Sequence, residues 1–242
     1  MSQIQLIHGN CEDYLHLMAD NQYDLAIVDP PYFSGPERRK YYGKSVSTTN
    51  TRRVEYPTDV ARWQVPGPAY FEQLFRVSRH QIIWGCNYFD VLYPGPGRIV
   101  WDKCNGTSSF SDCEIAYCSL HDSVRLFPFM WNGMCQGKSI TQGRLQRGDK
   151  RLNQQRIHPT EKPIELYKWL LSTYAQPGWK ILDTHFGSGS IALACYDLGF
   201  DLTAYEIEAV HHQNAVKRFN QYTAQMPVPF SVPFSTSNLT IG

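Results

Sequence analysis

The chain has 242 residues, a net charge of +1 and 42% hydrophobic residues, which suits one domain with a full hydrophobic core. No apolar run approaches the roughly 20 residues of a membrane span and no secretory leader is visible, so a cytoplasmic protein without membrane contact is expected. The seven cysteines include no C-x-x-C pair, which indicates reduced thiols and argues against a disulfide framework or a zinc site.

Seven segments have the composition of strands, and helical patterns separate several of them. The strands are expected at 4–8, 24–29, 81–84, 99–102, 114–118, 180–183 and 202–206, with helices at 69–77 and 164–174. Alternation of this kind predicts an α/β domain with a doubly wound, mostly parallel seven-stranded sheet. Such sheets bind ligands beyond the carboxyl ends of their strands. Asp29, Asp183 and Glu206 fall at predicted carboxyl ends, which places three acids at one edge.

The strand at 24–29 runs into a rigid corner with the sequence Asp29-Pro30-Pro31-Tyr32. Two consecutive prolines fix their φ angles and lack N–H groups, so the carbonyls of this corner are free to accept hydrogen bonds from a ligand. A carboxylate lies on one side and an aromatic ring on the other, an arrangement that suits an amino group on a flat ring. A strand that simply ends in a Pro-Pro turn is the structural alternative.

Two segments carry most of the positive charge. Residues 33–62 have a net charge of +4 and residues 138–156 one of +5, which suits contact with a phosphate backbone, although charged loops can also simply be solvated. The first segment contains three cations next to a ring, at Arg38, Arg39, Lys40 and Tyr41. Such a ring could stack on unpaired bases. The second segment has too few apolar residues for a core of its own, is expected to be mobile without nucleic acid, and offers side chains that read base edges. Its predicted contacts are Arg144, Arg147, Lys150, Arg151 and Arg156.

The strand at 180–183 is followed by a glycine-rich loop, Phe186-Gly187-Ser188-Gly189, and by an apolar helix that should stop at Gly199. A further strand ends at Glu206. Strand, glycine-rich turn, helix, strand and acid in this order predict a nucleotide-binding unit, because the glycines admit a ligand close to the backbone and the acid can hold ribose hydroxyls. Close packing of a helix on a strand also selects such glycines.

Together these motifs resemble the β class of S-adenosylmethionine-dependent DNA amino-methyltransferases, in which D-P-P-Y precedes F-x-G-x-G. Residues 6–11 (L-I-H-G-N-C), 101–103 (W-D-K) and 158–163 (H-P-T-E-K-P) match further segments of that class. The resemblance covers nearly the whole chain. It implies a single Rossmann-like methyltransferase domain at 1–242, with a basic loop at 33–62, a short target-recognition insertion at about 127–157 and an extended tail at 226–242.

The resemblance implies methyl transfer to adenine N6 of DNA, with cytosine N4 as the alternative, because an acid at the first motif position is more usual in the adenine enzymes. The carboxylate of Asp29 and the carbonyl of Pro30 would accept the hydrogens of the amine, and Tyr32 would stack on a base flipped out of the duplex. The short insertion predicts a short or loose target sequence. A bacterial source is implied, with a phage or plasmid gene and a homodimer as open alternatives.

The resemblance also assigns the S-adenosylmethionine pocket. The loop 186–189 would pass under the methionine portion, and Asp183 would order that loop or hold water at the amino-acid end, with Asp29 at the methyl end. Glu206 would bind the ribose hydroxyls and Ile207 the face of the adenine ring, while Asn10 and Cys11 would meet the edge of that ring. Thr160 and Lys162 are candidates for the methionine carboxylate, although Lys162 could equally cap the sheet edge. The chain departs from the class at Asn10, where Asp is common, and at Thr184-His185, where Pro-Phe is common.

Three other readings remain. A dinucleotide-dependent dehydrogenase fits the glycine pattern, but only 53 residues follow Gly189, too few for the second half of such a domain. A non-catalytic nucleic-acid-binding module would not need the D-P-P-Y corner, and RNA is an alternative substrate because single strands suit stacking loops. The histidines form no ligand constellation, and His211 and His212 are expected on a helix surface.

Overall fold

The structure of the chain is a computed structural model, which describes residues 2–32, 64–106, 111–132, 135–145, 153–154, 156–158 and 160–225. Several predicted features lie outside the described residues. These are the basic loop with Arg38, Arg39, Lys40 and Tyr41, the insertion residues Arg147, Lys150 and Arg151, and the tail at 226–242.

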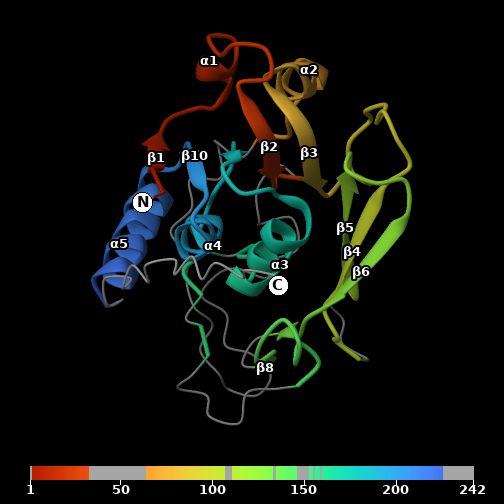
Figure 1. Ribbon diagram of the computed structural model, residues 1–242, viewed down its shortest axis with the longest axis vertical. Helices are drawn as coiled ribbons and strands as arrows, with labels where there is room; N and C mark the ends of the chain where they lie inside the picture. Colours follow the sequence, from red (N-terminus) through yellow and green to blue (C-terminus); the bar gives the residue numbers. More distant parts are fainter. Residues whose placement is uncertain are drawn as a thin grey trace, which may run out of the picture.

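An eight-stranded sheet forms the centre of the described chain (Figure 1), in the order β1-β10-β9-β2-β3-β5-β4-β6. All neighbouring strands are parallel except β5, which runs antiparallel to β3 and to β4. The strands are β1 (Ile4–His8), β2 (Tyr23–Val28), β3 (Ser78–Trp84), β4 (Arg98–Asp102), β5 (Cys113–Cys118), β6 (Val124–Pro128), β9 (Lys180–Asp183) and β10 (Asp201–Glu206). The prediction of a mostly parallel α/β sheet is therefore confirmed.

The predicted number of seven strands is wrong, because β6 adds an eighth at the edge of the sheet. Its side chains Val124 and Leu126 are 66% and 56% exposed, so the strand does not show the alternation of buried and exposed residues that marks a half-buried strand. Beyond it, β7 (Trp131–Asn132) and β8 (Cys135–Gln136) pair as a separate short ribbon within the predicted insertion.

Helices cover both faces of the sheet. The helices are α1 (Glu12–Leu15), α2 (Pro68–Val77), α3 (Ile164–Tyr174), α4 (Ser190–Leu198) and α5 (Ala209–Gln225). Successive residues of a strand point to opposite faces, and β2 shows this directly. Leu25 and Ile27 join the core formed with α3 and α4, whereas Ala26 and Val28 join the core formed with α1 and α2. The near-continuous apolar sequence of β2 follows from burial on both sides.

The glycine-rich turn between β9 and α4 has the geometry that its sequence predicts. Gly189 caps the start of α4 at φ 73°, and Gly199 ends the helix at φ 78°, conformations that glycine adopts without a steric penalty. All seven cysteines are free thiols. Among the described residues no helix is long and apolar enough to cross a membrane, and no group of His, Cys, Asp and Glu has the arrangement of a metal site.

Candidate active site

Three acids meet at the carboxyl edge of three neighbouring strands. Asp29 follows β2, Asp183 ends β9 and Glu206 ends β10, and these strands lie side by side in the sheet. A cavity of about 330 Å³ opens at this edge, within the range of small-molecule sites, roughly 300–1,000 Å³. Ten predicted residues line it: Asn10, Cys11, Asp29, Thr160, Lys162, Phe186, Gly187, Ser188, Glu206 and Ile207. Pro31 also lines it, whereas Asp183 and Gly189 do not.

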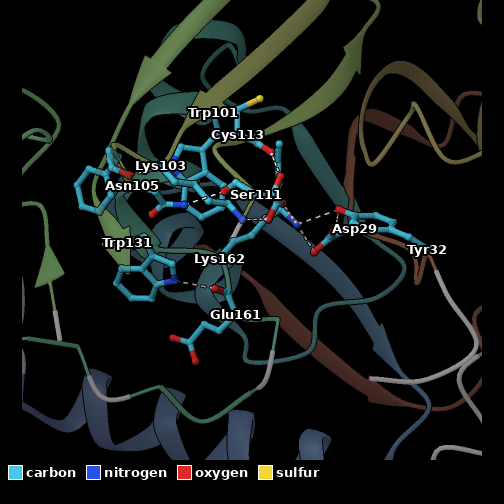
Figure 2. Close-up of polar contacts among 12 residues, drawn as sticks. Asp29, Tyr32, Trp101, Lys103, Asn105, Ser111, Cys113, Trp131, Glu161 and Lys162 are labelled. Carbon is cyan, nitrogen blue, oxygen red and sulfur yellow. Dashed lines mark hydrogen bonds and ion pairs between the residues drawn. The ribbon is translucent and has the colours of Figure 1, made fainter. Parts of the chain in front are cut away.

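The D-P-P-Y corner folds back on its own acid. The hydroxyl of Tyr32 donates a hydrogen bond to Oδ1 of Asp29, as Figure 2 shows. The Tyr32 ring stacks on Tyr88, with 5.0 Å between centroids and 12° between planes. The same ring lies against Gly85, which has φ +70° and whose place leaves no room for a side chain. Backbone and rings together fix the direction of the Asp29 carboxylate.

Lys162 lies on the other side of Asp29. Its Nζ forms an ion pair with Oδ2 of Asp29 and lies 3.1 Å from Oε2 of Glu114, while Oε1 of Glu114 lies 2.5 Å from Nζ of Lys103. Burial raises the pKa of Asp29, and the charge of Lys162 opposes that shift. Burial also acts on Glu114, but Lys162 and Lys103 outweigh it and bring the pKa of Glu114 to about 2.

Glu206 and Asp183 hold the glycine-rich loop through backbone amides. Glu206 accepts hydrogen bonds from the N–H of Gly187 at 3.0 Å and from that of Glu208 at 2.8 Å, and Oδ1 of Asp183 accepts one from His185 N at 2.9 Å. Oδ2 of Asp183 is buried with no hydrogen-bond partner in the described part of the chain. Gly187 has φ +51°, so the loop exposes backbone to the cavity at a position suited to glycine.

Burial also perturbs both of these acids. It raises the pKa of Asp183 to about 8 and the pKa of Glu206 to about 7. The side chain of Asp183 is only 1% exposed, so its ionised form is costly without a ligand. In the ligand-free protein Asp183 is therefore protonated at neutral pH.

The stability of the ligand-free protein is expected to fall as pH rises from 5.5 to 8. Folded Asp183 keeps its proton up to about pH 8, whereas in the unfolded chain it releases it near pH 4. The native state thus binds more protons in this window, and the free energy of unfolding falls by up to roughly 1.4 kcal/mol per pH unit. The melting temperature should fall by roughly 3–5 °C per pH unit in differential scanning calorimetry.

Asp183→Asn, which cannot release a proton, should make this slope shallower by up to roughly 1.4 kcal/mol per pH unit, most clearly between pH 7 and 8, above the pKa of about 7 of Glu206. Asp13→Asn on the exposed start of α1 should keep the slope. An Asp183→Asn protein with the parent slope would contradict the assignment of the perturbed proton.

Several pocket residues were not predicted from the sequence. His158 lines the cavity, and its ring contacts that of His211 at 4.2 Å between centroids. The prediction that His211 lies on a helix surface is wrong, because it is 2% exposed. His211 lies on the buried face of α5. Its burial could not be read from the sequence, because the prediction of buried helix positions uses apolar residues and histidine is polar.

His185, which the sequence left without a role, belongs to a hydrogen-bonded chain beside the cavity. The hydroxyl of Tyr70 lies 2.6 Å from Oγ1 of Thr184, which lies 2.9 Å from Nδ1 of His185. Nε2 of the same ring lies 4.0 Å from Sγ of Cys11. Burial lowers the pKa of His185 to about 4, so the ring is a neutral wall of the pocket.

Comparisons with known proteins point to one kind of enzyme. The family model N6_N4_Mtase, described as DNA methylase, matches residues 129–217. The Type II methyltransferase M.HinfI of Haemophilus influenzae is 23% identical over 251 residues, which span 89% of this chain and 68% of that protein. The Type II methyltransferase M2.MboI of Moraxella bovis is 24% identical over 246 residues, which span 90% of this chain and 88% of that protein.

The chain is a DNA methyltransferase, similar to the N6/N4 amino-methylating enzymes. Solved structures support the fold of this methyltransferase. The M1.HpyAVI–SAM complex matches with a TM-score of 0.51 at 17% identity, over 89% of this chain and 100% of that one. The cytosine-N4-specific PvuII DNA methyltransferase matches with a TM-score of 0.56 at 12% identity, over 93% and 91%. These matches identify the fold as Rossmann-like.

Two of the predicted DNA contacts of the methyltransferase are described. Arg156 stacks on Trp131 at 4.7 Å from the ring centroid and donates a hydrogen bond to the Trp131 carbonyl. Arg144 is 67% exposed and lies 3.9 Å from Oδ2 of Asp102. Trp131 is buried in the main core, so this part of the insertion is joined to the body of the methyltransferase.

Proposed function

We propose that the methyltransferase transfers a methyl group from S-adenosylmethionine to N6 of adenine in DNA. The observation that carries this proposal is the position of Asp29, in the lining of the cavity and bonded through Oδ1 to a donor hydroxyl. A carboxylate held in this way is an acceptor for the N–H of an exocyclic base amine. Asp at the first position of the motif favours adenine, since the cytosine-N4 enzymes of the family more often have Ser there.

The residues of the corner act on the base amine. Its lone pair is delocalised into the ring, so it is a weak nucleophile. Hydrogen bonds from its two hydrogens to the carboxylate of Asp29 and the carbonyl of Pro30 favour the pyramidal form and localise the lone pair on nitrogen. Alignment of the reacting groups supplies much of the remaining acceleration. The methylated nitrogen then releases one proton, for which Asp29 is an acceptor already in place.

S-adenosylmethionine supplies a sulfonium methyl group, so the N–C bond forms as the S–C bond breaks and the electron pair stays on sulfur. The residues around the cavity fit this cofactor. Glu206 presents a carboxylate suited to ribose hydroxyls, and Gly187 leaves the backbone accessible. The Oδ1 atom of Asn10 accepts a hydrogen bond from Glu12 N at 3.2 Å. A second lone pair on that oxygen remains for the adenine amine.

The target base must leave the duplex to reach Asp29. The ring of Tyr32, already stacked on Tyr88, supplies the surface on which an extruded base would stack. Arg144 and Arg156 lie on the insertion and are proposed to contact the DNA with the basic residues at 38–40 and 147–151. We further propose, from the brevity of the insertion, that the target sequence is short or loosely specified.

The proposed reaction is tested by transfer of tritiated methyl groups to unmethylated phage DNA, followed by digestion and nucleoside chromatography. The expected product is N6-methyladenine. N4-methylcytosine would transfer the assignment to the other branch of the family, and label in an equal mass of RNA but not in DNA would change the substrate class. Binding of sinefungin without any transfer would favour a non-catalytic DNA-binding module.

A further inference from the structure

Lys162 lines the cavity, but its ammonium group is paired with two acids. Its side chain is 3% exposed, and its ammonium group lies between the carboxylates of Asp29 and Glu114. The face of Trp84 closes the site, 5.5 Å from Nζ to the ring centroid. A buried ammonium group is strongly unfavourable unless its charge is paired, and two carboxylates provide that pairing. The positive charge of Lys162 is thus neutralised by Asp29 and Glu114 within the protein.

Glu114 ties this lysine to the far half of the sheet. It lies on β5, and its other oxygen is held at 2.5 Å by Lys103, the residue after β4. The four side chains therefore alternate in charge from Lys103 through Glu114 and Lys162 to Asp29, in the arrangement that Figure 2 shows for the labelled members. Because β4 and β5 are paired, this line of charges is anchored in the sheet.

The two oxygens of Asp29 have different partners. Oδ2 is held by the buried ammonium group of Lys162, and Oδ1 by the hydroxyl of Tyr32. An amine donor can replace the hydroxyl donor on Oδ1, and the displaced Tyr32 hydroxyl keeps a partner because it also accepts a hydrogen bond from Nζ of Lys162 at 3.3 Å. Withdrawing the ammonium group would leave a buried charge unpaired. Oδ1 is thus the oxygen available to a base.

We propose that Lys162, held by Glu114, is a positioning residue that fixes Oδ2 of Asp29, so that Oδ1 receives the amine of the target base in exchange for the Tyr32 hydroxyl. This inference rests on the proposed role of Asp29 as the acceptor. It replaces the expectation that Lys162 binds the methionine carboxylate of the cofactor.

The proposal predicts opposite pH effects for two variants. The charged or titratable groups that face Asp29 come from β5 (Glu114), β9 (Asp183), α3 (Tyr167), the segment before α3 (Lys162) and the motif itself (Tyr32). Lys162 lowers the pKa of Asp29 and Glu114 raises it. Loss of the lysine charge must therefore move the acid limb of the rate profile to higher pH, and loss of the glutamate charge must move it to lower pH.

The test compares Lys162→Met, Glu114→Gln and Asp29→Ala with a matched control, Lys168→Met. Lys168 forms an ion pair with Asp197 at 2.7 Å and lies six positions further along, away from the cavity lining. Single-turnover transfer of tritiated methyl groups to unmethylated phage DNA is measured from pH 5 to 9, and sinefungin binding by calorimetry. Circular dichroism reports folding.

In Lys162→Met we expect a rate about 100-fold lower at pH 7 and an acid limb at least about one unit higher, with sinefungin affinity within about threefold of the parent. Glu114→Gln should shift the acid limb to lower pH, and Lys168→Met should change neither the rate profile nor the sinefungin affinity.

Two outcomes would overturn the proposal. The first is sinefungin binding weakened tenfold or more with an unmoved acid limb in Lys162→Met, which would assign the lysine to the cofactor. If Lys162→Met fails to fold, the direction of the Glu114→Gln shift decides, and an upward or absent shift overturns it. An active Asp29→Ala protein would instead refute the role of Asp29 itself.

Discussion

Replacing Asp29 with alanine is expected to reduce methyl transfer by on the order of 10³-fold, while the protein still binds S-adenosylmethionine. The substitution removes the acceptor for the amine and leaves the rest of the cavity in place, since the glycine-rich loop is held by Glu206 and Asp183. Transfer of tritium to unmethylated phage DNA measures the first effect, and calorimetric titration with sinefungin measures the second.

The control for this substitution is Asp20→Ala. Asp20 is an exposed acid in the same N-terminal segment, and its ion pair with Arg76 at 2.7 Å should contribute little to stability, as surface pairs generally do. Its variant should keep full activity. Transfer by Asp29→Ala within tenfold of the parent rate would show that the amine finds its acceptor elsewhere.

Gly85→Ala is expected to lower activity at least about 100-fold by displacing Tyr32. A Cβ at this position would overlap the Tyr32 ring, so the ring must leave its place against Tyr88, and the surface proposed to stack on the extruded base is lost. A side chain at φ +70° also strains the backbone by roughly 1–2 kcal/mol. The loss of activity, measured by methyl transfer at saturating DNA, should exceed any effect of this strain on folding.

Gly178→Ala separates the two effects. Gly178 has φ +86°, and a Cβ there would meet no atom within 4 Å, so this variant carries similar backbone strain without the overlap. Both variants should show lowered melting temperatures, with the larger decrease in Gly85→Ala because of the overlap, but only Gly178→Ala should retain its activity. Equal activity in the two proteins would mean that the position of Tyr32 does not matter for the reaction.

Local patterns in the sequence predicted the part of the fold around the proposed cofactor site, from β9 to α4. The strand from Lys180 to Asp183, the glycine turn and the stop at Gly199 are each specified by adjacent residues, and the structure shows all three. The edge strand β6 was missed because its exposed apolar residues carry no periodicity. The burial of His211 was missed because no local pattern distinguishes an inward polar ring from an outward one.

The charge line through Lys162 could not be predicted from the sequence either. It joins residues 29, 103, 114 and 162, which come together only because β5 inserts between β3 and β4 in the sheet. The D-P-P-Y motif indicated an acceptor corner, but a motif cannot show which oxygen of the acid is already occupied. That information depends on long-range packing.

The pairing of β1 with β10 has a consequence for protein synthesis. His8 pairs with Glu206 and the N–H of Gly9 donates to the Glu206 carbonyl, so two walls of the proposed donor pocket are translated 198 residues apart. A growing polypeptide on the ribosome already carries its acceptor corner but has nowhere to seat a methyl donor. Seating of the proposed methyl donor therefore requires the pairing of β10 with β1, and a product truncated before Asp201 would lack one wall of the proposed pocket.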